Sequence, residues 1–114
     1  DLTFVKDTCD GFIEIYNSEK LFGEVTNIGM NSEISMRSLV DIITSNFNSN
    51  FTIIDDSSRV RPKKSEVERL VCENNKLINN TSWKPKYKLE TGLQETIEWF
   101  IKYSHLYKNN IYNV

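Results

Sequence analysis

The chain alternates stretches of helical apolar spacing with short apolar runs. Apolar residues recur at three and four positions over residues 9–16, 36–47 and 89–101, which predicts three amphipathic helices. A shorter helix is expected around Leu77 and Ile78, after the asparagines at 74 and 75. Short runs at Glu24–Gly29 and Phe51–Ile54 predict strands, and Leu2–Val5 is expected to be a short extended piece that leads into the first helix.

The same spacing predicts which helix faces are buried. In the first helix these positions are Cys9, Phe12, Ile13 and Tyr16; in the second they are Met36, Leu39, Val40, Ile43 and Phe47; in the last they are Leu89, Leu93, Ile97, Phe100 and Ile101. One hundred and fourteen residues suit a single small domain. The pattern therefore predicts a mixed α/β (α+β) fold over residues 1–114, made of helices and a few short strands.

Single residues sharpen this picture. Gly11 lowers helix propensity by up to about 1 kcal/mol, so we expect close packing against another element there. Ser35 is positioned to cap the second helix, and Thr91 to Gln94 has the form of a capping box for the last one. Trp83, followed closely by proline, is expected to be a buried anchor.

Composition excludes several classes of function. The net charge is −2 and the pI about 5.4, with both signs spread along the chain, so no nucleic-acid or anionic-membrane partner is expected. No apolar run has membrane-spanning length. Cys9 and Cys72 lack metal-ligand spacing and His105 stands alone, so no metal site is predicted. Buried free thiols and the lack of a secretory signal favour a cytoplasmic location.

Charge concentrates after residue 58. Arg59 and Arg61 are two positions apart, Lys63 and Lys64 follow, and Pro62 restricts the backbone of Arg61 to extended conformations. A guanidinium offers a fixed fork of donors that matches phosphate oxygens. A solvated, salt-bridged surface loop is the alternative interpretation from the residues alone.

Three patches in order resemble a known family. They are Asp1–Ile13 (DLTFVKDTCDGFI), Thr26–Gly29 (TNIG), and a tail containing Arg61-Pro62, Ser65-Glu66-Val67, Leu70, Trp83-Lys84-Pro85 and Trp99-Phe100. In this order they resemble the extended short-chain dehydrogenase/reductase family, the NAD-dependent nucleotide-sugar epimerases and 4,6-dehydratases. The resemblance covers nearly the whole chain.

The resemblance implies that this chain is the C-terminal, substrate-binding portion of a Rossmann-type enzyme. The family's glycine-rich turn and its Tyr-x-x-x-Lys pair are not found here, so we expect no catalytic residue and no cofactor-binding residue in residues 1–114. NAD(P) would be bound by an N-terminal Rossmann domain outside this chain. The resemblance also implies a homodimeric parent enzyme.

The resemblance further assigns roles to single residues. Arg61 is the first candidate for contacting the nucleotide diphosphate, and Arg59 is the second. Glu66 corresponds to a carboxylate that holds a ribose hydroxyl or a base edge; an apparent two-residue insertion after Pro62 leaves Glu68 as the alternative.

The predicted function is that of a substrate-binding fragment that clamps the diphosphate of a nucleotide sugar and catalyses nothing alone. The basic stretch resembles most closely 4,6-dehydratases of the UDP-N-acetylhexosamine or GDP-mannose type. Three alternatives stay open: part of a nucleotide-sugar 4-epimerase, a non-catalytic binding module for anionic nucleotides, and an oligomerisation module that uses the aromatic last helix as its interface.

Overall fold

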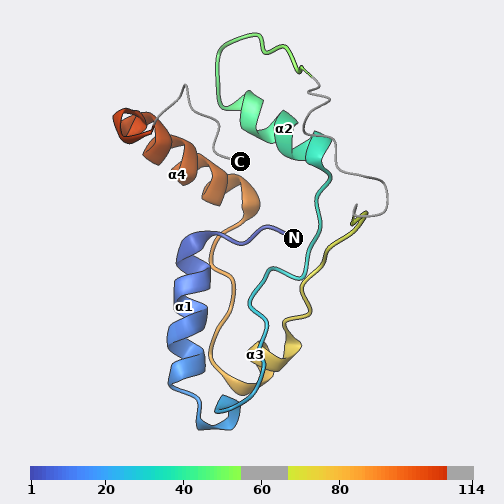
Figure 1. The fold of residues 1–114 in the computed structure, drawn as a ribbon, viewed down its shortest axis with the longest axis vertical. Coiled ribbons are helices and arrows are strands. Elements are labelled where there is room, and N and C mark those ends of the chain that lie inside the picture. The colour runs from blue at the N-terminus through green and yellow to red at the C-terminus, as the bar shows by residue number, and fades with distance from the viewer. Residues whose placement is uncertain (55–66, 108–114) are drawn as a thin grey trace.

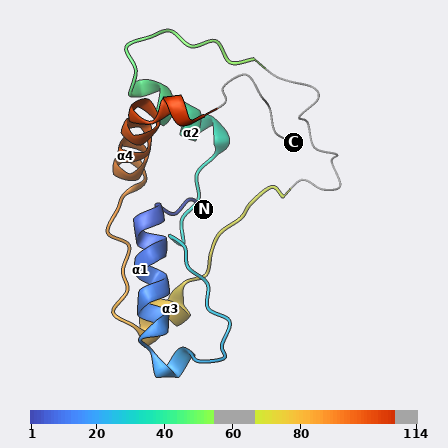
Figure 2. The same cartoon turned by 60° about the vertical axis from the view of Figure 1, so that its left-hand side comes forward.

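A computed structural model describes residues 1–54 and 67–107 of the chain (Figure 1). The helices are α1 (Val5–Tyr16), α2 (Met36–Ser45), α3 (Asn75–Asn80) and α4 (Leu89–Lys102), with 3-10 turns η1 (Glu19–Leu21) and η4 (Ser104–Leu106). Both ribbon views place α1 and α3 in one half of the molecule and α2 and α4 in the other (Figures 1 and 2). Long extended segments connect the halves. No helix within the described ranges is long and apolar enough to cross a membrane.

The predicted mixed α/β fold is wrong for this chain, because residues 1–54 and 67–107 contain helices and no strand. The expected strands at Glu24–Gly29 and Phe51–Ile54 do not form, whereas the extended piece expected before the first helix is present as far as Phe4, and Val5 begins α1. A strand exists only through backbone bonds to a neighbour. The segment at Gly29 does lie beside a second extended segment, but a side chain joins them: Asn74 Nδ2 donates to the Gly29 carbonyl at 2.8 Å.

The side of α1 that faces the rest of the chain is its acidic side. Asp7, Asp10 and Glu14 lie at positions i, i+3 and i+7 and therefore form one stripe. The segment 82–87 runs antiparallel along this stripe: the Ser82 amide donates to Glu14 at 3.1 Å, and Lys86 Nζ forms an ion pair with Asp10 at 2.5 Å.

The predicted buried face of α1 is consequently wrong. Phe12, Ile13 and Tyr16 are 65%, 57% and 79% exposed, and Cys9 is exposed as well. The helix is amphipathic as predicted, but its apolar side faces away from the chain. Periodicity identifies an apolar face, and it does not identify what covers that face.

Asp7 holds the centre of this arrangement and is fully buried. Its carboxylate accepts hydrogen bonds from the backbone amides of Lys86 at 3.0 Å and Tyr87 at 3.1 Å. The Asp7 carbonyl accepts from Trp83 Nε1 at 2.9 Å. Trp83 is 2% exposed, which confirms its prediction as an anchor.

The core beneath this segment is small. Its buried apolar residues are Leu21, Leu77 and Trp83, packed against Ile15, Ile28 and Ile78. A Cβ at Gly11 would lie 2.9 Å from Ile28 Cγ2, which confirms the predicted close packing at that glycine. The Cα radius of gyration is 17.4 Å, against about 13 Å for a compact domain of this length.

Of the two predicted helix caps, the one on α2 is confirmed and the one on α4 is wrong. Ser35 caps α2, since its hydroxyl accepts from the Ser38 amide at 3.0 Å. The capping box at Thr91 does not form, because α4 begins at Leu89, and Thr91 Oγ1 instead donates to the Lys88 carbonyl. Part of each predicted stripe is exposed: Met36 in α2, Phe100 and Ile101 in α4.

Asp7→Asn should destabilise the chain by about 1–3 kcal/mol, because the amide presents a donor to a buried backbone N–H that needs an acceptor. Urea denaturation followed by circular dichroism measures the change. Asp10→Asn is the matched control: it removes an exposed ion pair on the same stripe and should shift stability by less than about 1 kcal/mol. Equal losses in both variants would contradict the anchoring role of Asp7.

Candidate functional site

The three residues predicted to bind substrate, Arg59, Arg61 and Glu66, lie outside the described residues. The part of the chain that the structure describes resumes at Val67. Residues 67–70 are therefore the described residues that directly follow the three candidates. Val67 and Leu70 are 63% and 71% exposed, so this stretch does not pack against the core.

A groove of about 660 Å³ lies between residues 67–70 and the N-terminus of α2. Its polar side chains come from four sites in the chain: Asp1, Glu33, Ser35, and the pair Glu68 and Arg69. Glu68, the alternative to Glu66 as the predicted carboxylate, thus lines this groove and is exposed there.

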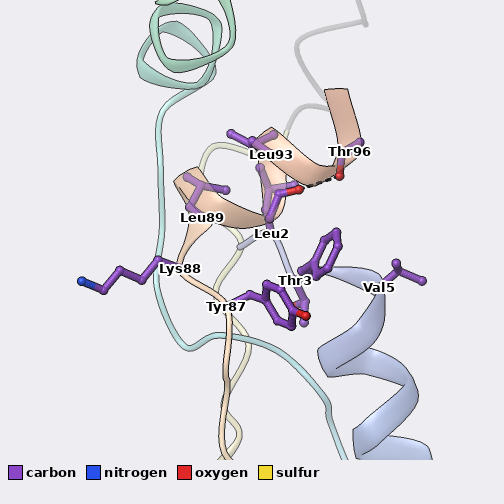
Figure 3. Close-up of a pocket in the computed structure, with 10 residues that line it drawn as sticks. Leu2, Thr3, Val5, Tyr87, Lys88, Leu89, Leu93 and Thr96 are labelled. Atoms are coloured by element: carbon purple, nitrogen blue, oxygen red, sulfur yellow. Dashed lines mark hydrogen bonds between the residues drawn. The ribbon is translucent and has the colours of Figure 1, made fainter. Parts of the chain in front are cut away.

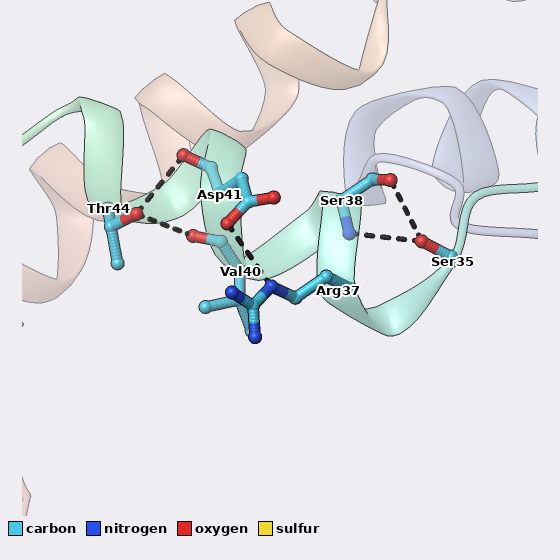
Figure 4. A network of polar contacts seen from close by, with 6 residues as sticks. All are labelled: Ser35, Arg37, Ser38, Val40, Asp41 and Thr44. Atoms are coloured by element: carbon cyan, nitrogen blue, oxygen red, sulfur yellow. Dashed lines mark hydrogen bonds and ion pairs between the residues drawn. The ribbon is translucent and has the colours of Figure 1, made fainter. Parts of the chain in front are cut away.

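The N-terminal end of α2 forms one wall and is held by local hydrogen bonds (Figure 4). The hydroxyls of Ser35 and Ser38 lie 2.8 Å apart, in addition to the backbone cap at Ser35. One turn later Arg37 forms an ion pair with Asp41 at 3.7 Å, and Arg37 does not line the groove. This wall is therefore ordered independently of anything the groove binds.

An ion pair spans the groove from one wall to the other. Arg69 Nε donates to Glu33 Oε2 at 2.8 Å, and Arg69 Nη2 donates to Glu33 Oε1. Hydrogen bonding from Arg69 lowers the pKa of Glu33, and the same bond raises the pKa of Arg69. Paired in this two-pronged geometry, Arg69 has its charge balanced by Glu33.

The charges define what the described walls can bind. Asp1, Glu33 and Glu68 contribute carboxylates, and Arg69 contributes the one guanidinium among the groove's described side chains. Carboxylates accept hydrogen bonds from sugar hydroxyls and base N–H groups. A diphosphate needs additional cationic donors, which these walls do not supply.

A second cavity, of about 330 Å³, lies between the start of α1 and the start of α4 (Figure 3). Its walls include Leu2, Val5, Leu89 and Leu93, and the Lys88 side chain points away from them. Such a lining, with four aliphatic side chains, suits an apolar group.

No group of histidine, cysteine or acidic side chains that could hold a metal is found in residues 1–54 and 67–107. The sequence contains no glycine-rich dinucleotide turn.

Sequence reasoning missed Asp1, Glu33 and Arg69 as groove residues. Arg69 belongs to the charged stretch that contains the predicted site residues. Its partner, Glu33, lies thirty-six positions earlier in the chain. No local signal in the sequence indicates such a pairing.

Comparisons with known proteins support the family resemblance. The chain is 30% identical to mouse dTDP-D-glucose 4,6-dehydratase over 111 residues, which are 93% of this chain and 30% of that protein. It is 25% identical to dTDP-glucose 4,6-dehydratase of Xanthomonas campestris pv. campestris over 107 residues, 89% of this chain and 30% of that protein. It is 29% identical to probable GDP-L-fucose synthase 1 of Oryza sativa subsp. japonica over 79 residues, 69% of this chain and 23% of that protein.

No family model and no solved structure matches the chain. The chain spans about 30% of the length of the 4,6-dehydratases it matches. It is a weak homologue of nucleotide-sugar 4,6-dehydratases, as expected for a portion of an extended short-chain dehydrogenase/reductase. The resemblance read from its motifs is thereby confirmed at the level of the nucleotide-sugar dehydratase and epimerase family.

The Arg69–Glu33 pair predicts a pH dependence. Because the pKa of Glu33 is lowered in the folded chain, the stabilisation from this pair is present above the ordinary glutamate value, about 4.3, and is lost as pH falls through the lowered value. In Arg69→Gln the pKa of Glu33 should rise toward its ordinary value, as read from the side-chain carboxyl carbon by NMR.

Arg37→Gln is the matched control, since it removes an arginine from the adjacent turn of α2 that pairs with Asp41. The Glu33 titration should not change in that variant. An unchanged Glu33 titration in Arg69→Gln would show that the ion pair does not persist in solution.

Proposed function

We propose that this chain is the substrate-binding portion of an NAD(P)-dependent nucleotide-sugar 4,6-dehydratase and clamps the nucleotide diphosphate. The observation that carries the proposal is the similarity of 93% of the chain to a dTDP-D-glucose 4,6-dehydratase. From the residues of its basic stretch, the proposed substrate is a UDP-N-acetylhexosamine or a GDP-mannose type sugar.

The geometry of the groove supports this assignment. Arg61 and Arg59 would supply the cationic donors that the described walls lack, since their segment leads directly into Val67. Glu66, or Glu68 in the alternative register, would accept from a ribose hydroxyl or a base edge. The division of roles is then simple: guanidinium groups hold the diphosphate, and a carboxylate orients the nucleoside.

Holding the diphosphate would fix the sugar relative to a cofactor bound elsewhere in the enzyme. Positioning of this kind contributes several kcal/mol to a reaction when it brings the reacting atoms into contact. The cofactor would supply hydride transfer at the sugar. The residues of this chain would bind and orient, and without a cofactor-binding portion they would catalyse nothing.

The outward apolar face of α1 supports a further part of the proposal, a contact with a cofactor-binding Rossmann domain. Val5, Cys9, Phe12, Ile13 and Tyr16 lie on this exposed face, while the acidic stripe of α1 is already covered. The relatives are about three times as long as the chain, so polypeptide sufficient for such a domain belongs to enzymes of this kind. An exposed contiguous apolar surface is typical of a contact between domains.

Two neighbouring isoleucines test the orientation of α1. Ile13→Ser should change the stability of this chain by less than about 0.5 kcal/mol, because Ile13 is exposed. Ile15→Ser, the matched control, should cost about 2 kcal/mol or more, because Ile15 packs against the core. Urea denaturation measures both. If Ile13→Ser is as damaging as Ile15→Ser, the apolar face of α1 is buried within this chain and is not free to contact another domain.

Nucleotide binding is tested by titration calorimetry with UDP-N-acetylglucosamine, GDP-mannose and dTDP-glucose. Arg61→Ala should weaken binding of the preferred ligand by roughly 10–100-fold, the loss expected for charge-assisted hydrogen bonds of about 1.5–3 kcal/mol. Arg37→Ala is the matched control and should leave the affinity unchanged, because Arg37 lies outside the groove. Absence of heat with all three ligands would refute nucleotide binding by this chain.

The alternative functions differ from this proposal in whether they predict nucleotide binding or self-association. A portion of a 4-epimerase would give the same binding result. The cytoplasmic location and the homodimeric parent enzyme also stay predictions. An oligomerisation module is favoured by one observation: Trp99, Phe100 and Tyr107 form an exposed aromatic cluster at the end of α4, with ring centroids 5.1–5.9 Å apart. Concentration-dependent association without nucleotide binding would support that module instead.

A further inference from the structure

The carboxylate of Asp1 joins two extended segments that do not pair as strands. Asp1 Oδ1 accepts from the Met30 amide at 3.0 Å, and Asp1 Oδ2 accepts from the Cys72 amide at 3.0 Å. Each oxygen thus binds a different segment, one leading to α2 and the other leaving the groove wall at residues 67–70. We infer that Asp1 is a positioning residue of the proposed nucleotide-binding groove, because its carboxylate fixes the wall at residues 67–70 against the segment that leads to α2.

Packing at the same place supports the inference. A Cβ at Gly29 would lie 2.6 Å from Cys72 Sγ, so the two backbones approach each other more closely than any other side chain at 29 would permit. Asn74 Nδ2 adds its bond to the Gly29 carbonyl. The backbone nitrogen of Asp1 donates to the Leu70 carbonyl at 2.9 Å. Four hydrogen bonds therefore converge on residues 29–30 and 70–74, and Asp1 makes three of them.

Asp1 is connected to the groove on both sides. It lines the groove itself, together with Glu33 and Arg69. Met30 precedes Glu33 by three residues, and Cys72 follows Arg69 by three, so the carboxylate lies at the base of the Arg69–Glu33 pair. Releasing it would let the wall at residues 67–70 move away from α2, and Glu68, the proposed carboxylate in the alternative register, would move with that wall. This role rests on the proposed function.

Cys72 provides a readout that needs no ligand. Burial of the thiol raises the pKa of Cys72 above its ordinary value, so less reactive thiolate is present at pH 8. Cys9 is exposed, and the measurement is therefore made in a Cys9→Ser background. In Asp1→Asn the amide nitrogen would face a backbone donor, and we expect modification of Cys72 by a disulfide reagent to become about tenfold faster as the contact opens.

The second readout is the dissociation constant for the preferred nucleotide sugar, measured on the same variant under conditions where circular dichroism shows it fully folded. Asp1→Asn should weaken binding about tenfold, and Asp1→Glu, which keeps the carboxylate, should restore part of the affinity. Asp10→Asn, with the same substitution at an exposed ion pair on α1, should change neither readout. A role in global stability alone would shift the denaturation midpoint and leave the affinity of the folded protein unchanged.

The outcomes separate the two proposals. Faster Cys72 modification together with weaker binding supports the positioning role. Faster modification with unchanged binding overturns it while the proposed function stands, and unchanged modification overturns it as well. If the unsubstituted chain binds no nucleotide, the proposed function fails and the positioning role fails with it, whatever Cys72 shows.

Discussion

A buried carboxylate that binds two backbone amides determines how this chain folds. Asp7 lies in the first turn of α1, and its two oxygens take up the amides of Lys86 and Tyr87, which an extended segment would otherwise leave without partners. Trp83 closes the arrangement from the other side by donating to the Asp7 carbonyl. A buried carboxylate without such donors would be costly, so these contacts are interdependent: the segment 83–87 must lie along α1 for Asp7 to be buried at all.

The rotation of α1 follows from this constraint. Because the acidic stripe must face the segment 82–87, the apolar stripe faces outward, and the chain retains a small core around Leu77. A domain selected to be stable alone would bury its largest apolar face first. On α1 the chain buries a carboxylate, Asp7, and a glycine, Gly11, while Phe12 and Ile13 stay exposed, which is the arrangement expected of a helix shared between two bodies.

The sequence could predict what depends on neighbouring residues and could not predict what depends on distant ones. Ser35 as a cap and Trp83 as an anchor are confirmed, since their signals are the residues themselves and their immediate neighbours. The strand expected at Glu24–Gly29 is wrong, because side chains replace the backbone ladder of a sheet. The neighbouring segment bonds to the Gly29 carbonyl through the Asn74 side chain, and its Cys72 amide donates to the Asp1 carboxylate. In the site, Arg59, Arg61 and Glu66 stay predictions because they lie outside the described residues, and the pairing of Arg69 with Glu33 needed the fold.

The same physical device occurs twice near the start of the chain. Asp7 and Asp1 each use two carboxylate oxygens to accept hydrogen bonds from two backbone amides of extended segments: Asp7 holds one segment against α1, and Asp1 joins two segments to each other. Paired strands distribute their backbone hydrogen bonds over many residues, whereas a carboxylate makes its hydrogen bonds from a single residue. The position of the groove wall at residues 67–70 accordingly depends on few atoms. That wall carries Glu68 and Arg69, so the shape of the groove is controlled from its base, at a residue that need not contact the ligand.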